Sequence, residues 1–242
     1  MSIKVFIRND YQELSIKAAE IVEETVSDNP FPVLGLATGK TPTGLYRQLV
    51  ADYSRGIISF SNVKTVNLDE YAGLSADDTR SFAFFMKKNL FSHIDILPQN
   101  TYIPNGAADD LSIECRRYSY ILKNLKRDIQ LLGIGSNGHI GFNEPGTPFD
   151  STTYVVRLAE STRKDNSGAF GGMENVPEMA ITMGISDIMS AKKILLLASG
   201  KNKASAVREM LLGKVSEDCP ASILQRHPDA TVILDRDASR LI

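Results

Sequence analysis

Short apolar runs alternate with amphipathic helical periods along nearly the whole chain, and this alternation restricts the possible folds most strongly. Residues 3–7 form the first run, and apolar residues recur at helical spacing over 11–26. The same pairing repeats along the rest of the chain. Repeated strand–helix units predict an α/β fold, specifically a Rossmann-like, mainly parallel sheet with helices on both faces. Because no linker divides the sequence, we expect one domain over residues 1–242.

The charge and cysteine content exclude several classes of function. The 242 residues carry a net charge of −2, which gives no electrostatic footprint for nucleic acid or an anionic membrane. No apolar run reaches the length of a membrane span, and the N-terminus reads as a strand rather than a signal peptide. Cys115 and Cys219 lie far apart and without metal-ligand spacing. They indicate reduced thiols, a cytoplasmic protein and no metal site.

Residues 131–145 read L-L-G-I-G-S-N-G-H-I-G-F-N-E-P, a buried strand followed by a glycine-rich loop. Residues 133–138 match G-x-G-x-x-G, but the glycines and prolines that follow will not sustain the helix that a dinucleotide site requires. The loop instead presents side chains. His139 and Glu144 can form an acid–base pair in which the acid orients the imidazole. A purely structural loop histidine is the alternative.

A second candidate site, T-G-K-T-P at 38–42, lies between a predicted strand and a predicted helix. Backbone N–H groups, two hydroxyls and the helix dipole favour a phosphate there. The stretch is one residue short of the G-x-x-x-x-G-K-T triphosphate loop, so a single phosphate suits it better. An ordinary turn is the alternative. The candidate phosphate-binding residues are Thr38, Gly39, Lys40 and Thr41.

Asp69 and Glu70 end a predicted strand at 63–68. One carboxylate can face a crevice while the other packs or pairs, and a partly desolvated carboxylate is a suitable base for a proton α to a carbonyl. Solvated loop acids are the alternative. Arg163 and Lys203 are candidates for a second contact to phosphate. The polar, glycine-rich segment 161–178 around Arg163 is predicted to be mobile and to act as a lid.

Together these stretches resemble the glucosamine-6-phosphate deaminase (isomerising) family. The resemblance is carried by T-G-K-T-P, N-L-D-E-Y at 67–71, the loop at 135–145, S-T-R at 161–163 and G-K-N-K at 200–203, in the family's order and spacing. It implies a hydrolase that isomerises and deaminates an amino sugar. Glucosamine 6-phosphate and water would give fructose 6-phosphate and ammonium, without a metal or other cofactor.

The resemblance also implies a role for each site residue. Asp69 would move a proton between C2 and C1, and His139, supported by Glu144 and Asn137, would open the pyranose ring. The phosphate would bind the 38–42 loop together with Arg163 and Lys203. The expected partner is the small-molecule substrate alone, and the expected assembly is a monomer or a small homo-oligomer.

Two departures from the family pattern affect these expectations. Many members have Asp where this chain has Asn137, and a neutral amide can orient a histidine without stabilising its cation by charge. Tyr154 and Val156 stand where allosterically regulated members carry basic residues, so we expect no activation by N-acetylglucosamine 6-phosphate. The competing functions are a 6-phosphogluconolactonase and a non-catalytic sugar-phosphate sensor.

Overall fold

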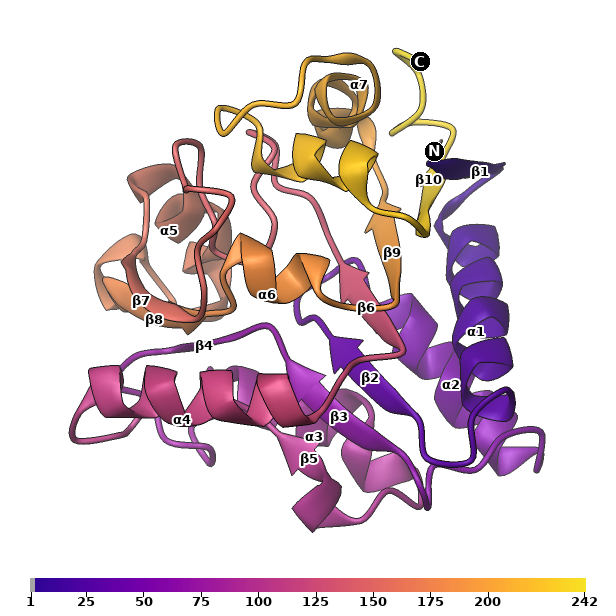
Figure 1. Ribbon diagram of the computed structural model, residues 1–242, viewed down its shortest axis with the longest axis horizontal. Helices are drawn as coiled ribbons and strands as arrows, with labels where there is room; N and C mark the ends of the chain where they lie inside the picture. The colour runs from indigo at the N-terminus through magenta and orange to yellow at the C-terminus, as the bar shows by residue number, and fades with distance from the viewer. Residues whose placement is uncertain (1–2) are drawn as a thin grey trace.

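The computed structural model describes residues 3–242, with the side chains of Ser161 and Asp165 outside the description. Its centre is a seven-stranded sheet in which every neighbouring pair is parallel (Figure 1). This confirms the predicted fold class. In spatial order the strands are β1 (Lys4–Arg8), β10 (Ala230–Asp235), β9 (Lys193–Ala198), β6 (Ile129–Leu132), β2 (Val33–Leu36), β3 (Lys64–Asn67) and β5 (Thr101–Tyr102).

Helices cover both faces of this sheet, as right-handed crossovers between parallel strands require (Figure 1). The connections that run toward β5 place three helices on one face: α1 (Tyr11–Ser27), α2 (Thr43–Ser54) and α3 (Phe82–Asn89). The connections that run toward β10 place three on the other: α4 (Leu111–Asn124), α6 (Ile185–Met189) and α7 (Ala204–Leu212). Within residues 3–242, no helix combines the length and apolar character needed to cross a membrane.

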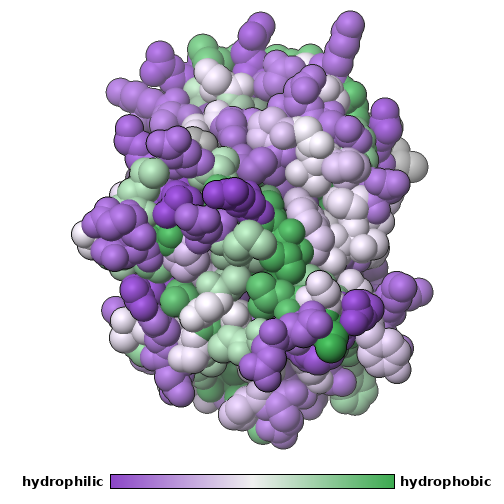
Figure 2. Space-filling view, turned by 90° about the vertical axis from the view of Figure 1, so that its left-hand side faces the viewer, coloured by the Kyte–Doolittle hydropathy of each residue, from purple (hydrophilic) through white to green (hydrophobic). Residues whose placement is uncertain are grey.

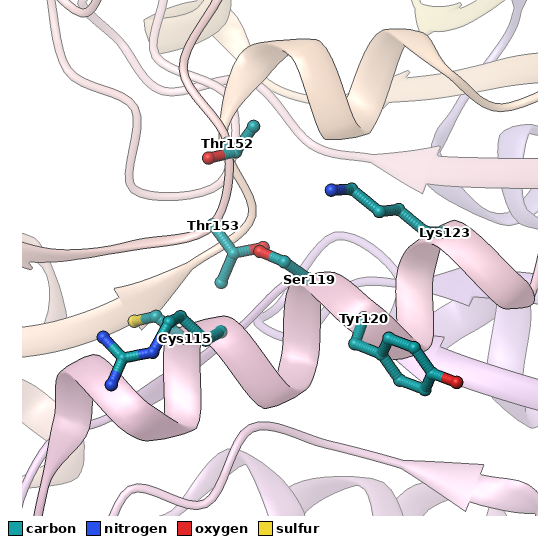
Figure 3. A pocket seen from close by; sticks show the side chains of 7 residues that line it. Cys115, Ser119, Tyr120, Lys123, Thr152 and Thr153 are labelled. Atoms are coloured by element: carbon teal, nitrogen blue, oxygen red, sulfur yellow. The ribbon is translucent and has the colours of Figure 1, made fainter.

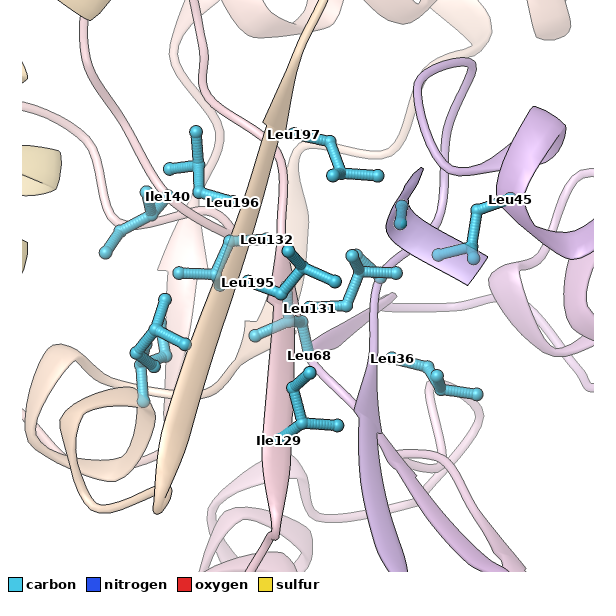
Figure 4. Packing of buried hydrophobic residues seen from close by; sticks show 14 of the residues in the cluster. Leu36, Leu45, Leu68, Ile129, Leu131, Leu132, Ile140, Leu195, Leu196 and Leu197 are labelled. Atoms are coloured by element: carbon cyan, nitrogen blue, oxygen red, sulfur yellow. The ribbon is translucent and has the colours of Figure 1, made fainter. Parts of the chain in front are cut away.

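The main core lies between the sheet and these helices. Figure 4 shows leucines and isoleucines of β2, β6 and β9 packed side by side, and Leu131, Leu195 and Leu196 are almost fully buried. Local signals set where the helices begin. Asp10 caps α1 by accepting the N–H of Glu13, and Ser81 caps α3 by accepting the N–H of Phe84. These caps fix the ends of helices whose apolar faces cover the strands.

A second, three-stranded antiparallel sheet projects from one end of the molecule. It pairs β4 (Asp69–Tyr71) with β8 (Met179–Thr182), and β8 with β7 (Tyr154–Arg157). Figure 2 looks onto this end and shows hydrophilic residues around a central patch of apolar surface. The sequence predicted one mainly parallel sheet, so this second sheet was not predicted. The side chains of β7 are only partly buried, which suits an antiparallel sheet with one solvated face.

Segment 161–178 is folded rather than irregular. It contains most of α5 (Glu160–Asn166) and two short 3₁₀ helices, η3 (Ser167–Ala169) and η4 (Met173–Asn175). Phe170 and Val176 are buried in a small apolar cluster with Tyr71 and Phe142. These two apolar residues anchor the segment against the second sheet, which its polar, glycine-rich composition did not indicate. That the segment moves as a lid stays a prediction.

Three further short elements were not predicted. They are the 3₁₀ helix η2 (Pro98–Asn100), the edge strand β5, and α6, which follows β8. Each is too short to carry a readable period. The remaining 3₁₀ helices are η1 (Phe91–His93), η5 (Lys201–Lys203) and η6 (Pro220–Arg226).

Candidate active site

The strand order reverses direction between β2 and β6, and a cavity of about 220 Å³ lies beyond the carboxyl ends of these strands. In open α/β sheets this switch point is where ligands bind. The loops after β2, β3, β6 and β9 all contribute to its wall. The lining residues that were predicted as site residues are Thr38, Gly39, Lys40, Thr41, Asp69, His139 and Lys203.

The 38–42 turn forms one end of the cavity. Gly39 has φ +98°, a conformation that other residues rarely adopt, and α2 begins at Thr43 with Pro42 as its N-cap. The hydroxyl of Tyr11, on α1, accepts the N–H of Gly44 at 2.7 Å and lies 2.9–3.0 Å from the carbonyls of Thr41 and Lys40, to which it can donate. A side chain of a neighbouring helix thus fixes the backbone of the predicted phosphate turn.

Lys203 reaches the same cavity from η5, just after β9. Arg163 does not line it. The Arg163 guanidinium donates instead to the carbonyls of Met173 and Val176, both at 3.1 Å, and its Nε is buried without a partner among the described residues. The structure therefore brings Lys203 to the phosphate turn but holds Arg163 within its own segment.

The adjacent acids Asp69 and Glu70 have separate tasks. The Glu70 carboxylate accepts the N–H groups of Phe82 and Ala83 at 2.9 and 2.8 Å, at the start of α3, and the N–H of Tyr71. It therefore caps a helix. Asp69 lines the cavity, and no hydrogen bond from a described residue ends on its carboxyl group. The two side chains can serve these separate purposes because neighbouring residues of a strand point in opposite directions.

Burial raises the pKa of both carboxyl groups, Asp69 and Glu70. Burial, with a smaller contribution from the charge of Glu70, raises the pKa of Asp69 to about 8. Burial also raises the pKa of Glu70, to about 7, although three backbone N–H groups oppose the shift. A carboxyl group with a pKa near neutrality is a stronger base than an ordinary aspartate once it is ionised. Asp69 therefore has the properties of a general base.

The loop after β6 holds His139 against the backbone. A Cβ on Gly135 would lie 2.3 Å from Nδ1 and Cε1 of the imidazole, so only glycine leaves room for the ring. Gly138 turns the chain with φ +86° and lies against Cys219. The glycines that match the dinucleotide motif thus position the side chain of His139.

Asn137 and Glu144 lie behind His139 and hold it. Oδ1 of Asn137 is 2.8 Å from Nδ1 of His139, and Nδ2 of Asn137 donates to Oε2 of Glu144 at 2.7 Å. Oε2 of Glu144 is also 3.5 Å from Nδ1 of His139. With the amide assigned in this orientation, Nδ1 carries the proton and Nε2 is the free base. Asn137 therefore supports the imidazole by bridging it to the carboxylate.

Glu144 stays ionised in this setting. Burial alone would raise its pKa, but hydrogen bonds with His139, Thr162 and Asn137 and the charge of His139 outweigh burial and lower the pKa to about 2. A permanent carboxylate beside Nδ1 stabilises the imidazolium form of His139. It supplies the charge that the neutral Asn137 lacks.

Sequence reasoning did not identify four other wall residues, which are Phe82, Phe142, Thr162 and Asn166. Phe82 and Phe142 stack with centroids 6.0 Å apart, and both pack on Tyr71. Phe142 lies within the motif already singled out, so its position there was the available signal. Thr162 lies in the S-T-R stretch at 161–163, which was the available signal for it, whereas Asn166, one helical turn later on α5, gave none.

A separate groove of about 400 Å³ lies between α4 and the chain before β7. Figure 3 shows Ser119 and Lys123 on α4 facing Thr152 and Thr153. It shares no lining residue with the first cavity and collects none of the candidate acid–base groups. Among the described residues, no cluster of three or more His, Cys, Asp or Glu side chains could hold a metal ion.

Comparison with known proteins covers nearly the whole chain. The family model for glucosamine-6-phosphate isomerases and 6-phosphogluconolactonases matches residues 10–233. Glucosamine-6-phosphate deaminase 1 of Bacillus subtilis is 55% identical over 240 residues, which are 99% of each chain. The deaminase of Thermoanaerobacter pseudethanolicus is 52% identical over 241 residues, covering 99% of this chain and 95% of its own.

Solved structures extend the comparison. A monomeric glucosamine-6-phosphate deaminase, 55% identical, superposes with a TM-score of 0.98 over 99% of this chain and all of its own. A 6-phosphogluconolactonase from Trypanosoma cruzi superposes with a TM-score of 0.81 over 99% of this chain and 97% of its own, but at 19% identity it shows the fold alone.

The relatives above 50% identity are named deaminases, and the description of the family model includes isomerases. These names do not support the expectation of a hydrolase. The family model covers most of the chain, and the two curated relatives exceed 50% identity over nearly its full length. The chain belongs to the family of glucosamine-6-phosphate isomerases and 6-phosphogluconolactonases, and its relatives of high identity are glucosamine-6-phosphate deaminases.

Proposed function

We propose that this protein is an enzyme that converts glucosamine 6-phosphate and water into fructose 6-phosphate and ammonium. One observation carries the proposal. A single cavity has the 38–42 turn and Lys203 in the same wall as Asp69 and His139. A sugar phosphate can therefore be held by its phosphate while its C1–C2 end meets a base and an imidazole.

The phosphate binds the N–H groups and hydroxyls of the 38–42 turn and the ammonium group of Lys203. Anions are favoured at such a strand-to-helix turn because backbone N–H groups and the helix dipole point toward them. Binding at this remote group aligns the reacting carbons, which converts binding energy into correct orientation. Arg163 joins the phosphate only by releasing its two carbonyl partners, so its contribution requires segment 161–178 to move as a lid.

His139 opens the pyranose ring. Its Nε2 takes the proton of the C1 hydroxyl group, and the resulting imidazolium returns a proton to the ring oxygen as the C1–O5 bond breaks. Glu144 stabilises the transient positive charge, and Asn137 keeps Nδ1 protonated so that Nε2 is available. Such a positioned acid–base group typically contributes about 10²–10⁴-fold to a rate.

Asp69 then moves the proton between the two carbons. Its carboxylate removes the proton from C2 of the open-chain aldehyde while the substrate's ammonium group passes a proton to O1, which gives a neutral enolamine. The protonated Asp69 then returns the proton to C1, which gives the iminium at C2. Water adds to the iminium, and ammonium leaves as the C2 carbonyl forms. No metal or other cofactor enters these steps. Since the protein of known structure at 55% identity is described as monomeric, we also propose a monomer.

The decisive experiment measures ammonium and fructose 6-phosphate with glucosamine 6-phosphate as the only substrate. The wild type should release both in equal amounts, and Asp69→Asn should release almost none. Asp77→Asn, a change of the same kind at an exposed aspartate, is the control and should keep full activity.

Other outcomes separate the competing functions. Hydrolysis of 6-phosphogluconolactone without ammonium release would identify a lactonase, and sugar-phosphate binding without either reaction would identify a sensor. A several-fold rate increase on adding N-acetylglucosamine 6-phosphate at subsaturating substrate would overturn the expectation that this protein lacks such activation.

A further inference from the structure

Thr162 connects α5 to the acid–base group. Its hydroxyl donates a hydrogen bond to Oε1 of Glu144, although the two residues lie 18 positions apart in the chain. The side chain lines the cavity and is only 4% exposed. Segment 161–178 is thereby joined directly to the carboxylate beside His139.

The two oxygens of Glu144 are held from different directions. Oε2 accepts from Asn137 and faces His139, and both of these residues belong to the same loop as Glu144. Oε1 is held by Thr162, from another element. The last torsion of a glutamate side chain is broad. With one oxygen anchored the carboxylate can turn, whereas two anchored oxygens fix its plane.

The neutral amide at Asn137 makes this second anchor more important. Asn137 holds Oε2 through one hydrogen bond and adds no charge of its own. The Glu144 side chain is only 16% exposed. If one of its hydrogen-bond donors is lost, water therefore cannot fully replace that hydrogen bond. The Thr162 hydroxyl is the described donor that keeps Oε1 satisfied.

We propose that Thr162 is a positioning residue, and that its hydroxyl keeps the His139–Glu144 pair aligned only while α5 forms part of the cavity wall. The inference rests on the proposed function and deepens it. If α5 moves away, Oε1 loses its donor, Glu144 turns, and Nδ1 of His139 loses the carboxylate that stabilises its cation. Ring opening is thus coupled to closure of the cavity.

The test compares Thr162→Val, which replaces the hydroxyl by a methyl group, with Thr162→Ser, which keeps it. We expect Thr162→Val to lower kcat about 10-fold, as misplacement of a catalytic group does. KM and the calorimetric affinity for fructose 6-phosphate should stay within about twofold, because the phosphate contacts are untouched. Thr162→Ser should recover most of kcat. A Thr162→Val enzyme with the kcat of the wild type, or a Thr162→Ser enzyme as slow as Thr162→Val, would overturn the proposal.

Thr25→Val is the matched control. Thr25 is also a buried helical threonine, 3% exposed, and its hydroxyl donates to the carbonyl of Ile21 on α1, away from the cavity. The same atoms are deleted, so any general loss of stability is reproduced. We expect an unchanged kcat. An equal fall in kcat in both variants would mean that Thr162 acts only through stability and would refute the proposal.

A double variant tests whether Thr162 acts through Glu144. In the Glu144→Gln background, adding Thr162→Val should lower kcat no further, because the ion that the hydroxyl positions is already gone. A full, independent fall in kcat would contradict the inference.

The wild type is assayed first. If it releases no ammonium, the proposed function fails and this inference with it, whereas an active wild type confines any failure to Thr162.

Discussion

Asp69 and Glu70 are consecutive residues of β4, yet the carboxyl group of Glu70 binds the first N–H groups of α3 while that of Asp69 faces the cavity. The β-strand geometry produces this difference, since successive side chains point to opposite faces. Pairing of Asp69 with Thr182 of β8 fixes the backbone at this point. The proposed base is thus held by a sheet, and its carboxyl group is kept apart from the helix cap that Glu70 forms.

The raised pKa of Asp69 predicts an unusual pH dependence. The carboxyl group must be ionised to remove a proton, and burial raises its pKa to about 8. After correction for ionisation of the substrate, kcat/KM should therefore rise about tenfold per pH unit from pH 6 toward pH 8. It should level off above pH 8. An acid limb centred near pH 4 would show that Asp69 ionises like an exposed aspartate and would contradict the burial argument.

The burial of Asp69 also predicts that its ionised carboxylate, which the proposed reaction needs, destabilises the fold. A carboxyl group whose pKa is raised in the folded state stabilises the fold fully below its unfolded pKa, and this contribution is lost as the pH rises through about 8. Asp69→Asn removes the charge, so the variant should be more stable than the wild type by about 1–3 kcal/mol at pH 8. The gain should shrink toward pH 4. Urea unfolding at both pH values measures it, and a variant less stable at pH 8 would contradict the expectation.

Gly135 allows His139 to lie against the backbone, and Gly135→Ala should therefore displace the imidazole. The added Cβ would approach ring atoms to 2.3 Å, and a displacement of about 1 Å at a catalytic group can cost about 10²-fold in rate. We expect kcat to fall by that order while fructose 6-phosphate still binds. Gly168→Ala is the control, because a Cβ there meets no atom within 4 Å. Equal kcat values for the two variants would show that the loop adapts.

The hydrogen bonds of Tyr11 predict that removing its hydroxyl group affects substrate binding alone. Its hydroxyl bonds the backbone on both sides of Pro42, so Tyr11→Phe should loosen the phosphate turn. Loss of one such hydrogen bond is worth about 1 kcal/mol, and KM should rise about fivefold with little change in kcat. Tyr53→Phe, near the other end of α2, is the control. A fall in kcat at constant KM would place Tyr11 in the chemical step instead.

The sequence predicted the large sheet and most of the site because these depend on local patterns. Apolar runs identified β2 and β6, and the loops that follow them carry the 38–42 turn and His139. The second sheet was missed because the pairing of β4 with β8 joins residues far apart in the chain, and D-E-Y alone does not indicate a strand. Arg163 was placed by analogy at the phosphate, but carbonyl groups of its own segment compete for its guanidinium.

The passage of β3 into β4 joins the two sheets at a single residue, Leu68. The 38–42 turn follows a strand of the large sheet, whereas Asp69 belongs to the small one. A shift of one sheet against the other would therefore change the separation between the proposed phosphate site and the proposed base. Leu68 is only 2% exposed and packs in the main core, which restrains such a shift.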